Sequence, residues 1–245
     1  MKNCVLITGG TGSFGKTMMH DLLAKGVSEV RVLSRDEEKQ DALRNSLRDD
    51  RVRFFVGDIR DRDSVDRAMQ GADCVFHAAA LKQEPSCAGL PGEAVKTNIL
   101  GSENVIRSAV QAKVANLVCL STDKAVYPVN AMGMSKAIME KFVLAIAREL
   151  GPDADTTLSS VRYGNVMYSR GSAIPLFVKQ IKTGLPITVT EPSMTRFLMP
   201  LRDSVALVHH AFENAQQGDL FIKKAPASTI GDLVEALKEL FERPD

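Results

Sequence analysis

A glycine-rich turn directly after a short apolar segment is the feature that most constrains this chain. The apolar segment is Cys4–Thr8, and the turn reads Gly-Gly-Thr-Gly-Ser-Phe-Gly over residues 9–15. Glycine is required where the backbone turns tightly and approaches a pyrophosphate, whose charge then meets free N–H groups at the start of a helix. Because the turn lies between a predicted strand and a predicted helix, it favours a dinucleotide site over a purely structural turn. The cofactor contacts expected in this turn are Gly9, Thr11, Gly12, Ser13, Phe14 and Gly15.

Short apolar segments alternate with longer helical ones along most of the chain. The predicted strands are Cys4–Thr8, Val30–Leu33, Val52–Val56, Cys74–His77, Leu117–Leu120 and Thr157–Val161. The predicted helices are Gly15–Lys25, Lys39–Leu47, Asp63–Met69, Ala94–Ala112, Ser135–Leu150, Asp203–Asn214 and Ile230–Phe241. This alternation is typical of a parallel sheet with crossover helices. It predicts an α/β fold: a Rossmann-type doubly wound parallel sheet with a smaller, partly interleaved lobe.

The composition argues against several other classes of protein. Lys and Arg number 31 against 30 Asp and Glu, and there is no basic tract, so we expect no nucleic-acid partner. No long apolar run and no signal-peptide pattern occurs, so we expect a cytoplasmic protein without a membrane span. The cysteines show no C-x-x-C spacing, which favours reduced thiols.

The end of the second predicted strand bears on the choice between NAD and NADP. An acid at this point would hydrogen-bond the ribose of NAD, but the chain places Ser34 and Arg35 there, with Lys39 within a helical turn. A hydroxyl and two cations suit a 2′-phosphate, so we predict NADP as the cofactor. Asp36 leaves NAD as the alternative if the strand runs longer. Further expected cofactor contacts are Asp58 and Ile59 after the third strand, and Ala78, Ala79 and Ala80 after the fourth.

Residues 121–136 look like a dehydrogenase catalytic segment whose usual acid is missing. Many nicotinamide enzymes of this layout carry Tyr-x-x-x-Lys, whereas this chain carries Met132-x-x-x-Lys136. A thioether cannot exchange a proton near neutral pH, so other groups must carry the chemistry. Asp123 and Lys124 are the candidates, because they follow a predicted strand at the sheet edge where α/β proteins bind ligands. The alternative is that this pair only caps the next helix.

Several motifs occur together in a specific order. They are Thr-Gly-Gly-Thr-Gly-Ser-Phe-Gly, Ser-Arg-Asp-Glu, Ala-Ala-Ala-Leu-Lys, Lys-Thr-Asn-Ile-Leu-Gly, Ser-Thr-Asp-Lys-Ala, Arg-Tyr-Gly-Asn-Val and Met-Thr-Arg-Phe. With them the chain resembles the extended short-chain dehydrogenase/reductase superfamily. Within that superfamily it is similar to the inverting UDP-N-acetylglucosamine 4,6-dehydratases of bacterial capsule and O-antigen biosynthesis, whose Met-x-x-x-Lys variant it shares.

The resemblance implies roles for the catalytic segment. Asp123 is expected to be the acid for the leaving C6 hydroxyl and Lys124 the base for the C5 proton, while Lys136 contacts the nicotinamide ribose. Lys124 must be neutral to act, and the charge of Lys136, with that of Lys82, favours this. Met132 is expected to pack beside the nicotinamide. The acceptor of the C4 hydroxyl proton remains open among Lys136, Lys124 and water.

The resemblance also implies contacts on the substrate side. Asn165 is expected against the sugar, with the backbone of Tyr163 and Val166 near the nicotinamide. Lys82 is a weaker substrate candidate and Asn98 a weaker cofactor candidate, and either can instead line the pocket or anchor a helix. The expected diphosphate and uracil contacts are Arg170, Ser172 and Arg196. The implied substrate is UDP-N-acetylglucosamine or a close UDP-sugar, and the implied assembly is a homo-oligomer.

The chain departs from the family pattern in two places, and two other functions compete with the dehydratase. Residues 87–92 are less bulky than the family pattern, and the family continues past residue 245 with a basic segment, so we expect a shortened C-terminus. We predict an NADP-binding Rossmann domain over residues 1–162 and segments of a substrate lobe over residues 163–245. The competing functions are a UDP-sugar 4-epimerase and a non-catalytic NADP-sensing protein.

Overall fold

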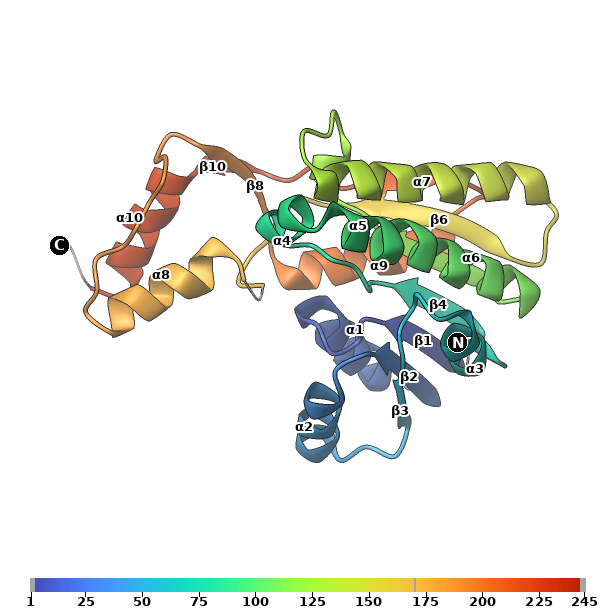
Figure 1. Cartoon of the computed structure of the whole chain (residues 1–245). Helices are drawn as coiled ribbons and strands as arrows, with labels where there is room; N and C mark the ends of the chain where they lie inside the picture. Colours follow the sequence, from blue (N-terminus) through green and yellow to red (C-terminus); the bar gives the residue numbers. More distant parts are fainter. Residues whose placement is uncertain (1–2, 170, 243–245) are drawn as a thin grey trace.

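A parallel sheet forms the main body of the protein. The computed structural model describes residues 3–169 and 171–242 (Figure 1). Seven strands follow the order β3-β2-β1-β4-β5-β6-β9, and every neighbouring pair is parallel. The strands are β1 (Cys4–Thr8), β2 (Glu29–Ser34), β3 (Val52–Val56), β4 (Cys74–His77), β5 (Asn116–Leu120), β6 (Thr157–Arg162) and β9 (Leu220–Ile222). The predicted doubly wound α/β fold is confirmed.

Helices cover both faces of this sheet and close two hydrophobic cores. The core on one face joins the strands to α3 (Arg62–Met69), α6 (Ser102–Gln111) and α7 (Ala131–Leu150). The core on the other face joins them to α1 (Ser13–Ala24), α2 (Glu37–Leu47) and α9 (Leu201–Asn214). Since both faces are covered at the centre of the sheet, all five residues of β1 and all four residues of β4 are buried.

The single helix predicted over Ala94–Ala112 is wrong. The chain there forms α5 (Pro91–Ala94), a π-helix η1 (Val95–Gly101) and then α6, and a short helix α4 (Glu84–Gly89) precedes them. The π-helix carries Asn98, which donates to the carbonyl oxygen of Leu81 at 2.8 Å and accepts from its N–H at 2.8 Å. Such widened turns form where tertiary contacts compete with helix geometry, which helical periodicity in the sequence does not reveal.

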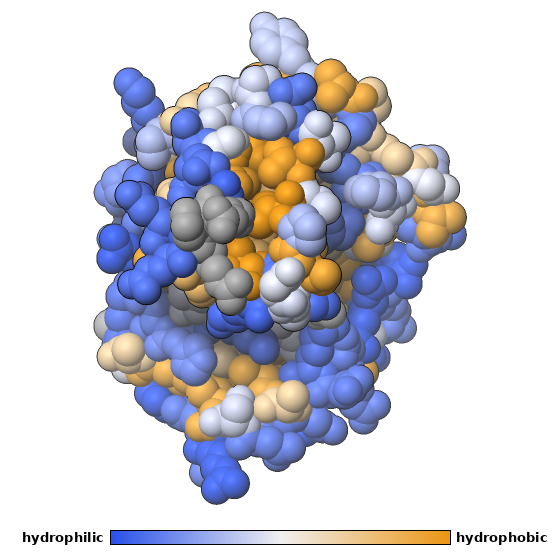
Figure 2. Space-filling view, turned by 90° about the vertical axis from the view of Figure 1, so that its left-hand side faces the viewer, coloured by the Kyte–Doolittle hydropathy of each residue, from blue (hydrophilic) through white to orange (hydrophobic). Residues whose placement is uncertain are grey.

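A smaller lobe lies to one side of the main body (Figure 1). It contains α8 (Ala173–Lys182), α10 (Ile230–Leu240) and a three-stranded sheet of β7 (Asn165–Val166), β8 (Thr195–Met199) and β10 (Ala227–Thr229). Thr229 caps α10 in a reciprocal capping box with Asp232. Figure 2 views the molecule from the side of this lobe and shows an apolar patch surrounded by hydrophilic residues.

The chain returns to the main body after it has begun the lobe. Helix α9 packs against the sheet, and β9 pairs in parallel with β6, although both elements lie within residues 163–245. The lobe is therefore partly interleaved with the Rossmann body, as predicted. His209 on α9 joins this return segment to α1, since its Nε2 lies 2.6 Å from Asp21 Oδ2.

Other expectations concern single residues and the character of the helices. Along the described chain, no helix combines the length and apolar character needed to cross a membrane. The four cysteines are free and buried. His77, at the end of β4, lies fully buried between the hydroxyls of Thr8 and Ser102 at 2.7 and 2.8 Å. Burial lowers the pKa of His77 to about 3, so its ring is neutral.

Candidate active site

A cleft of about 700 Å³ lies at the carboxyl edge of the main sheet. The predicted cofactor residues that line it are Gly9, Thr11, Gly12, Ser13, Phe14, Gly15, Ser34, Arg35, Lys39, Asp58, Ile59, Ala78, Ala79, Ala80, Lys136, Tyr163 and Val166. The predicted catalytic and substrate residues that line it are Lys124, Met132, Lys136, Lys82, Asn165 and Ser172. Asp123, Asn98 and Arg196 are not part of the lining, and Arg170 lies outside the described residues. Residues far apart in the sequence thus meet in one cleft.

The glycine turn gives the cleft a floor that side chains would block. Gly9 has a φ of +71°, and a Cβ there would lie 2.8 Å from the backbone of Ala79. A Cβ on Gly15 would lie 2.4 Å from Gly10 Cα. Gly12 caps α1 and carries no side chain to satisfy the N–H groups of the first turn. These features fit a dinucleotide whose pyrophosphate faces the helix N-terminus.

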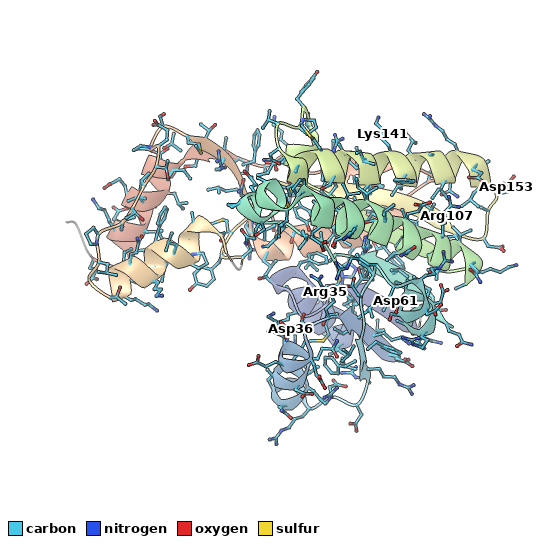
Figure 3. The ribbon with its side chains drawn as sticks, in the orientation of Figure 1. Arg35, Asp36, Asp61, Arg107, Lys141 and Asp153 are labelled. Atoms are coloured by element: carbon cyan, nitrogen blue, oxygen red, sulfur yellow. The ribbon has the colours of Figure 1, made fainter. Side chains whose placement is uncertain are left out.

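Arg35 and Asp36, labelled in Figure 3, follow the end of β2, and Asp36 is already hydrogen-bonded within the protein. It caps α2 by accepting from Lys39 N–H at 2.9 Å, and it also pairs with the Lys39 ammonium. Arg35, half exposed, points its guanidinium toward Asp58 with 3.6 Å between Nη1 and Oδ2. Burial acts to raise the pKa of Asp58, but hydrogen bonds from Arg60 and the charges of Arg60 and Arg35 lower it below the usual range. The end of β2 therefore offers the guanidinium of Arg35 to the cleft, while the carboxylate of Asp36 is used as the N-cap of α2.

The Asp123–Lys124 pair lies just beyond β5. Lys124 Nζ and Asp123 Oδ1 are 3.2 Å apart, and each side chain is about a quarter exposed (27% and 28%). Asp123 also accepts from the Thr122 hydroxyl at 2.9 Å, and its N–H donates to the Tyr163 carbonyl oxygen at 3.1 Å. Lys124 and Thr122 line the cleft, so the Asp123 carboxyl is connected to the cleft through them.

Lys136 and Met132 lie on the first two turns of α7. Asn130 caps this helix by accepting from Gly133 N–H at 2.9 Å, so the helix begins four residues earlier than predicted. Lys136 is buried and donates to the Leu120 carbonyl oxygen at 2.8 Å. Burial lowers the pKa of Lys136 to about 8. Met132 is 5% exposed and packs with Cys87 and Ala94 while lining the cleft.

Tyr127 does not supply the missing phenol. Its side chain is 94% exposed, and it is not among the residues that line the cleft. Tyr127 has a φ of 44° and lies in the loop between the Asp123–Lys124 pair and α7. The described lining includes the thioether of Met132, the amino groups of Lys124 and Lys136, and the hydroxyls of Ser121 and Thr122.

Comparison with known proteins identifies the family. The polysaccharide biosynthesis protein family matches residues 5–245. A UDP-glucose 4-epimerase of Rickettsia conorii is 54% identical over 242 residues, which are 97% of this chain and 71% of the relative. This chain belongs to the polysaccharide biosynthesis protein family. It is an enzyme of the extended short-chain dehydrogenase/reductase type, in which dehydratases and epimerases share one fold.

Solved structures agree with this assignment. The structure of Pen from Bacillus thuringiensis is 42% identical with a TM-score of 0.95, and the match covers 99% of this chain and 77% of that one. DesIV, a dTDP-glucose 4,6-dehydratase from Streptomyces venezuelae with NAD and TYD bound, is 25% identical with a TM-score of 0.84. That match covers 96% of this chain and 80% of DesIV. Among similar proteins, names of both dehydratases and epimerases therefore occur.

One wall of this short-chain dehydrogenase/reductase cleft is lined by Tyr163, Gly164, Asn165, Val166, Ser169, Gly171 and Ser172. Asn165 Oδ1 is buried and has no hydrogen-bond partner among the described residues, so it is an open acceptor at the cleft. Burial raises the pKa of Tyr163, whose ring stacks on Phe14 with centroids 6.5 Å apart. Ser172 begins α8 and donates to the Ser169 carbonyl oxygen at 2.6 Å. Arg196 lies on β8 and donates to Thr195.

Two structural residues of the site were missed by sequence reasoning. A Cβ on Gly133 would lie 2.3 Å from the Lys124 carbonyl oxygen, so this glycine lets α7 approach the catalytic pair. Its position inside Met-x-x-x-Lys was the available signal. Gln83 also lines the cleft and packs so closely on Gly171 that a Cβ there would lie 2.3 Å from Gln83 Nε2. No local sequence pattern pairs these two segments.

Proposed function

We propose that this enzyme catalyses NADP-dependent 4,6-dehydration of UDP-N-acetylglucosamine with inversion at C5. The product would be a UDP-2-acetamido-2,6-dideoxy-4-hexulose for surface polysaccharide synthesis. The observation that carries the proposal is the Asp123–Lys124 pair at a cleft where Met132 replaces the usual tyrosine. An acid and a base next to each other serve no purpose in a simple hydride transfer, but elimination of water needs both.

The proton balance of the reaction fits the geometry of the pair. When bound, the nicotinamide would accept hydride from C4 and return it to C6. Lys124 takes the C5 proton, which the C4 ketone has made acidic, and Asp123 gives a proton to the departing C6 hydroxyl. Return of hydride to C6 then leaves C5 to take up one proton, on the opposite face for inversion. The sugar thus loses two protons, from the C4 hydroxyl and from C5, and two are taken up, by the leaving C6 hydroxyl and by C5. Proton exchange between Lys124 and Asp123, whose Nζ and Oδ1 are 3.2 Å apart, and with the acceptor of the C4 hydroxyl proton returns every group to its starting state.

The cofactor proposal rests on the end of β2. DesIV binds NAD, and the glycine turn of this chain fits a dinucleotide of the same kind. NADP is proposed here because Arg35 can pair with a 2′-phosphate, while Asp36 is occupied by the N-terminus of α2 and by Lys39. Lys136 would hold the nicotinamide ribose from the opposite wall of the cleft.

The remaining site assignments are proposed from position. Asn165, Lys82 and Ser172 would contact the UDP-sugar from the cleft wall. Asn98 would act by anchoring the Leu81 segment, since it does not line the cleft. Residues 1–162 would bind the nucleotide and segments of residues 163–245 would supply the substrate lobe, while α9 and β9 from that range complete the main body. We also propose a homo-oligomer as the working assembly.

A UDP-sugar 4-epimerase is the second candidate, because the Rickettsia relatives carry that name. An epimerase removes and returns hydride at C4 and must move the C4 hydroxyl proton, but it needs neither a C5 base nor a C6 acid. Met132 cannot move that proton. Lys124 could accept that proton, but an acid at Asp123 beside it would have no chemical role in such an enzyme, which favours the dehydratase.

The test incubates the protein with NADP and either UDP-N-acetylglucosamine or UDP-glucose, in D₂O. We expect a 4-keto-6-deoxy product from UDP-N-acetylglucosamine that carries deuterium at C5, with NMR reporting inversion there. Lys124→Ala should bind NADP normally but lose product formation and C5 exchange. Lys141→Ala, exposed on α7, is the matched control and should retain both. Interconversion of C4 epimers without a 4-keto product would instead establish the epimerase.

A further inference from the structure

A buried ion pair lies behind the catalytic segment. Glu140 on α7 and Arg162 at the end of β6 have side chains only 9% and 21% exposed. Glu140 Oε1 accepts from Arg162 Nε at 2.8 Å, and Oε2 accepts from Arg162 Nη2 at 2.5 Å. This two-point geometry fixes both side chains more firmly than a single contact would. Buried charges are costly unless they are fully paired, so the arrangement has a defined orientation.

Ser121 connects this pair to the cleft. Its hydroxyl donates to Glu140 Oε1 at 2.5 Å, and its N–H donates to the Val161 carbonyl oxygen at 2.7 Å. The preceding carbonyl, that of Leu120, accepts from Lys136 Nζ at 2.8 Å. Lys136 and Glu140 lie one turn apart on α7, so two consecutive residues at the end of β5 are each held by one of them.

Arg162 is connected to the Asp123–Lys124 pair through the residue that follows it. The next residue, Tyr163, lines the cleft, and its carbonyl oxygen accepts from Asp123 N–H at 3.1 Å. The segment that carries Asp123 and Lys124 is therefore held between the ends of β5 and β6. The Glu140–Arg162 pair bridges both strand ends to the helix that supplies Lys136.

We propose that Glu140, held by Arg162, is a positioning residue for the dehydration. Through Ser121 it would fix the backbone that carries the catalytic pair, and so set where Lys124 stands relative to Lys136 and the sugar. This inference rests on the proposed function for its effect on turnover. Its structural part, the link from Glu140 to Lys136, can be measured without substrate.

The kinetic test compares three variants with the native enzyme. Glu140→Gln and Ser121→Ala should lower kcat, by about tenfold to a hundredfold for Glu140→Gln, because small misplacements of reacting groups are that costly. The KM for UDP-N-acetylglucosamine and the affinity for NADP should change little. Glu103→Gln, which removes an exposed ion pair with Arg107 on α6, is the matched control and should leave kcat unchanged. An unchanged kcat in Ser121→Ala would overturn the proposal, even if Glu140→Gln does not fold.

The second readout is the titration of Lys136, followed by NMR of protein with ¹³C-labelled lysine. The titratable groups that face Lys136 are Glu140 from its own helix, Cys119 from β5 and His77 from β4. Glu140→Gln should move the Lys136 midpoint below about 8, because a stabilising negative charge is lost. Ser121→Ala keeps that charge and should leave the midpoint in place. If the native protein does not dehydrate UDP-N-acetylglucosamine, the proposed function fails, whereas an unmoved midpoint in Glu140→Gln removes the link itself.

Discussion

The main body and the small lobe of this enzyme are built in different ways. Strands at the centre of the main body, such as β1 and β4, are covered on both faces, and many of the core side chains there have no exposed surface at all. The core of the lobe consists of six buried residues, each of which keeps 3–8% of its surface exposed. Strand β8 in the lobe is exposed at alternate positions, while β1 is buried throughout. The main body is therefore stabilised by two large buried cores, whereas the lobe has one small core whose residues are all partly exposed.

This difference matters for function because the cleft lies where the two parts meet. The glycine turn, the end of β2 and the Asp123–Lys124 pair all belong to the main body and lie at the carboxyl edge of its seven-stranded sheet. Ser169, Gly171 and Ser172 close the cleft from the segment that leads into the lobe. Elements with less buried apolar surface open more readily, so substrate entry is expected on the lobe side.

The largest expected effect comes from the same truncation made in each part. Leu117→Ala removes a fully buried side chain of β5 and should lower the free energy of unfolding by about 2–5 kcal/mol. Leu237→Ala, in the core of the lobe, should cost less because its site is already 8% exposed. Urea unfolding measures the totals, and amide hydrogen exchange shows whether the second loss stays within α10. Equal losses spread over both parts would contradict the comparison.

A pH dependence of stability should arise in the main body from Lys136. Its pKa is lowered from 10.5 to about 8 in the folded protein. Below pH 8 the buried ammonium is charged and costs stability; between 8 and 10.5 the unfolded chain binds more protons, so stability rises with pH. The full effect is on the order of 3 kcal/mol.

Lys136→Met should remove that rise. The comparison of the two proteins by urea unfolding at pH 7 and pH 10 isolates Lys136 from other groups that titrate there. Cys119 is one such group, because burial raises the pKa of its thiol to about 12, which lowers stability as the unfolded thiol ionises. The same pH slope in both proteins would show that Lys136 is not the source.

Arg35→Ala tests the nucleotide half alone. The substitution should weaken the binding free energy of NADP by about 1.5–3 kcal/mol, the range for a charged hydrogen bond, and leave the affinity for NAD nearly unchanged. Calorimetric titration of both cofactors measures the ratio. Arg53→Ala, an exposed arginine on β3 near Glu29, is the matched control. A preference for NADP that survives Arg35→Ala would shift the proposed contact to Lys39 or Ser34.

The smallest expected effect is that of Met132→Leu. Leucine keeps the approximate volume and apolar character of a residue that packs with Cys87 and Ala94, so the cost in stability should stay below about 1.5 kcal/mol. Turnover should fall only modestly, because the thioether takes no proton. Steady-state rates and thermal unfolding measure both. A loss of several orders of magnitude with NADP still bound would give Met132 a direct chemical part.

The nucleotide half could be predicted from the sequence because its signals are local. Strand Cys4–Thr8 was expected at the bounds observed, and the glycine turn gathers its contacts within seven consecutive positions. Strand residues that are apolar on both faces mark a covered parallel sheet without reference to partners. The α7 start was missed because its cap, Asn130, lies in a loop that the hydrophobic pattern does not reach.

The sequence by itself thus determined six of the seven strands of the main sheet, the glycine turn and the residue types available for chemistry, whereas β9 was not predicted. Only the tertiary structure decided how they are used: Asn98 anchors Leu81 from a π-helix, Asp36 is taken up as a helix cap, and Glu140 joins two strand ends. The physical reason is distance along the chain. Periodicity and turn chemistry act within a few residues, whereas these side chains find partners wherever folding places a buried donor or acceptor without one.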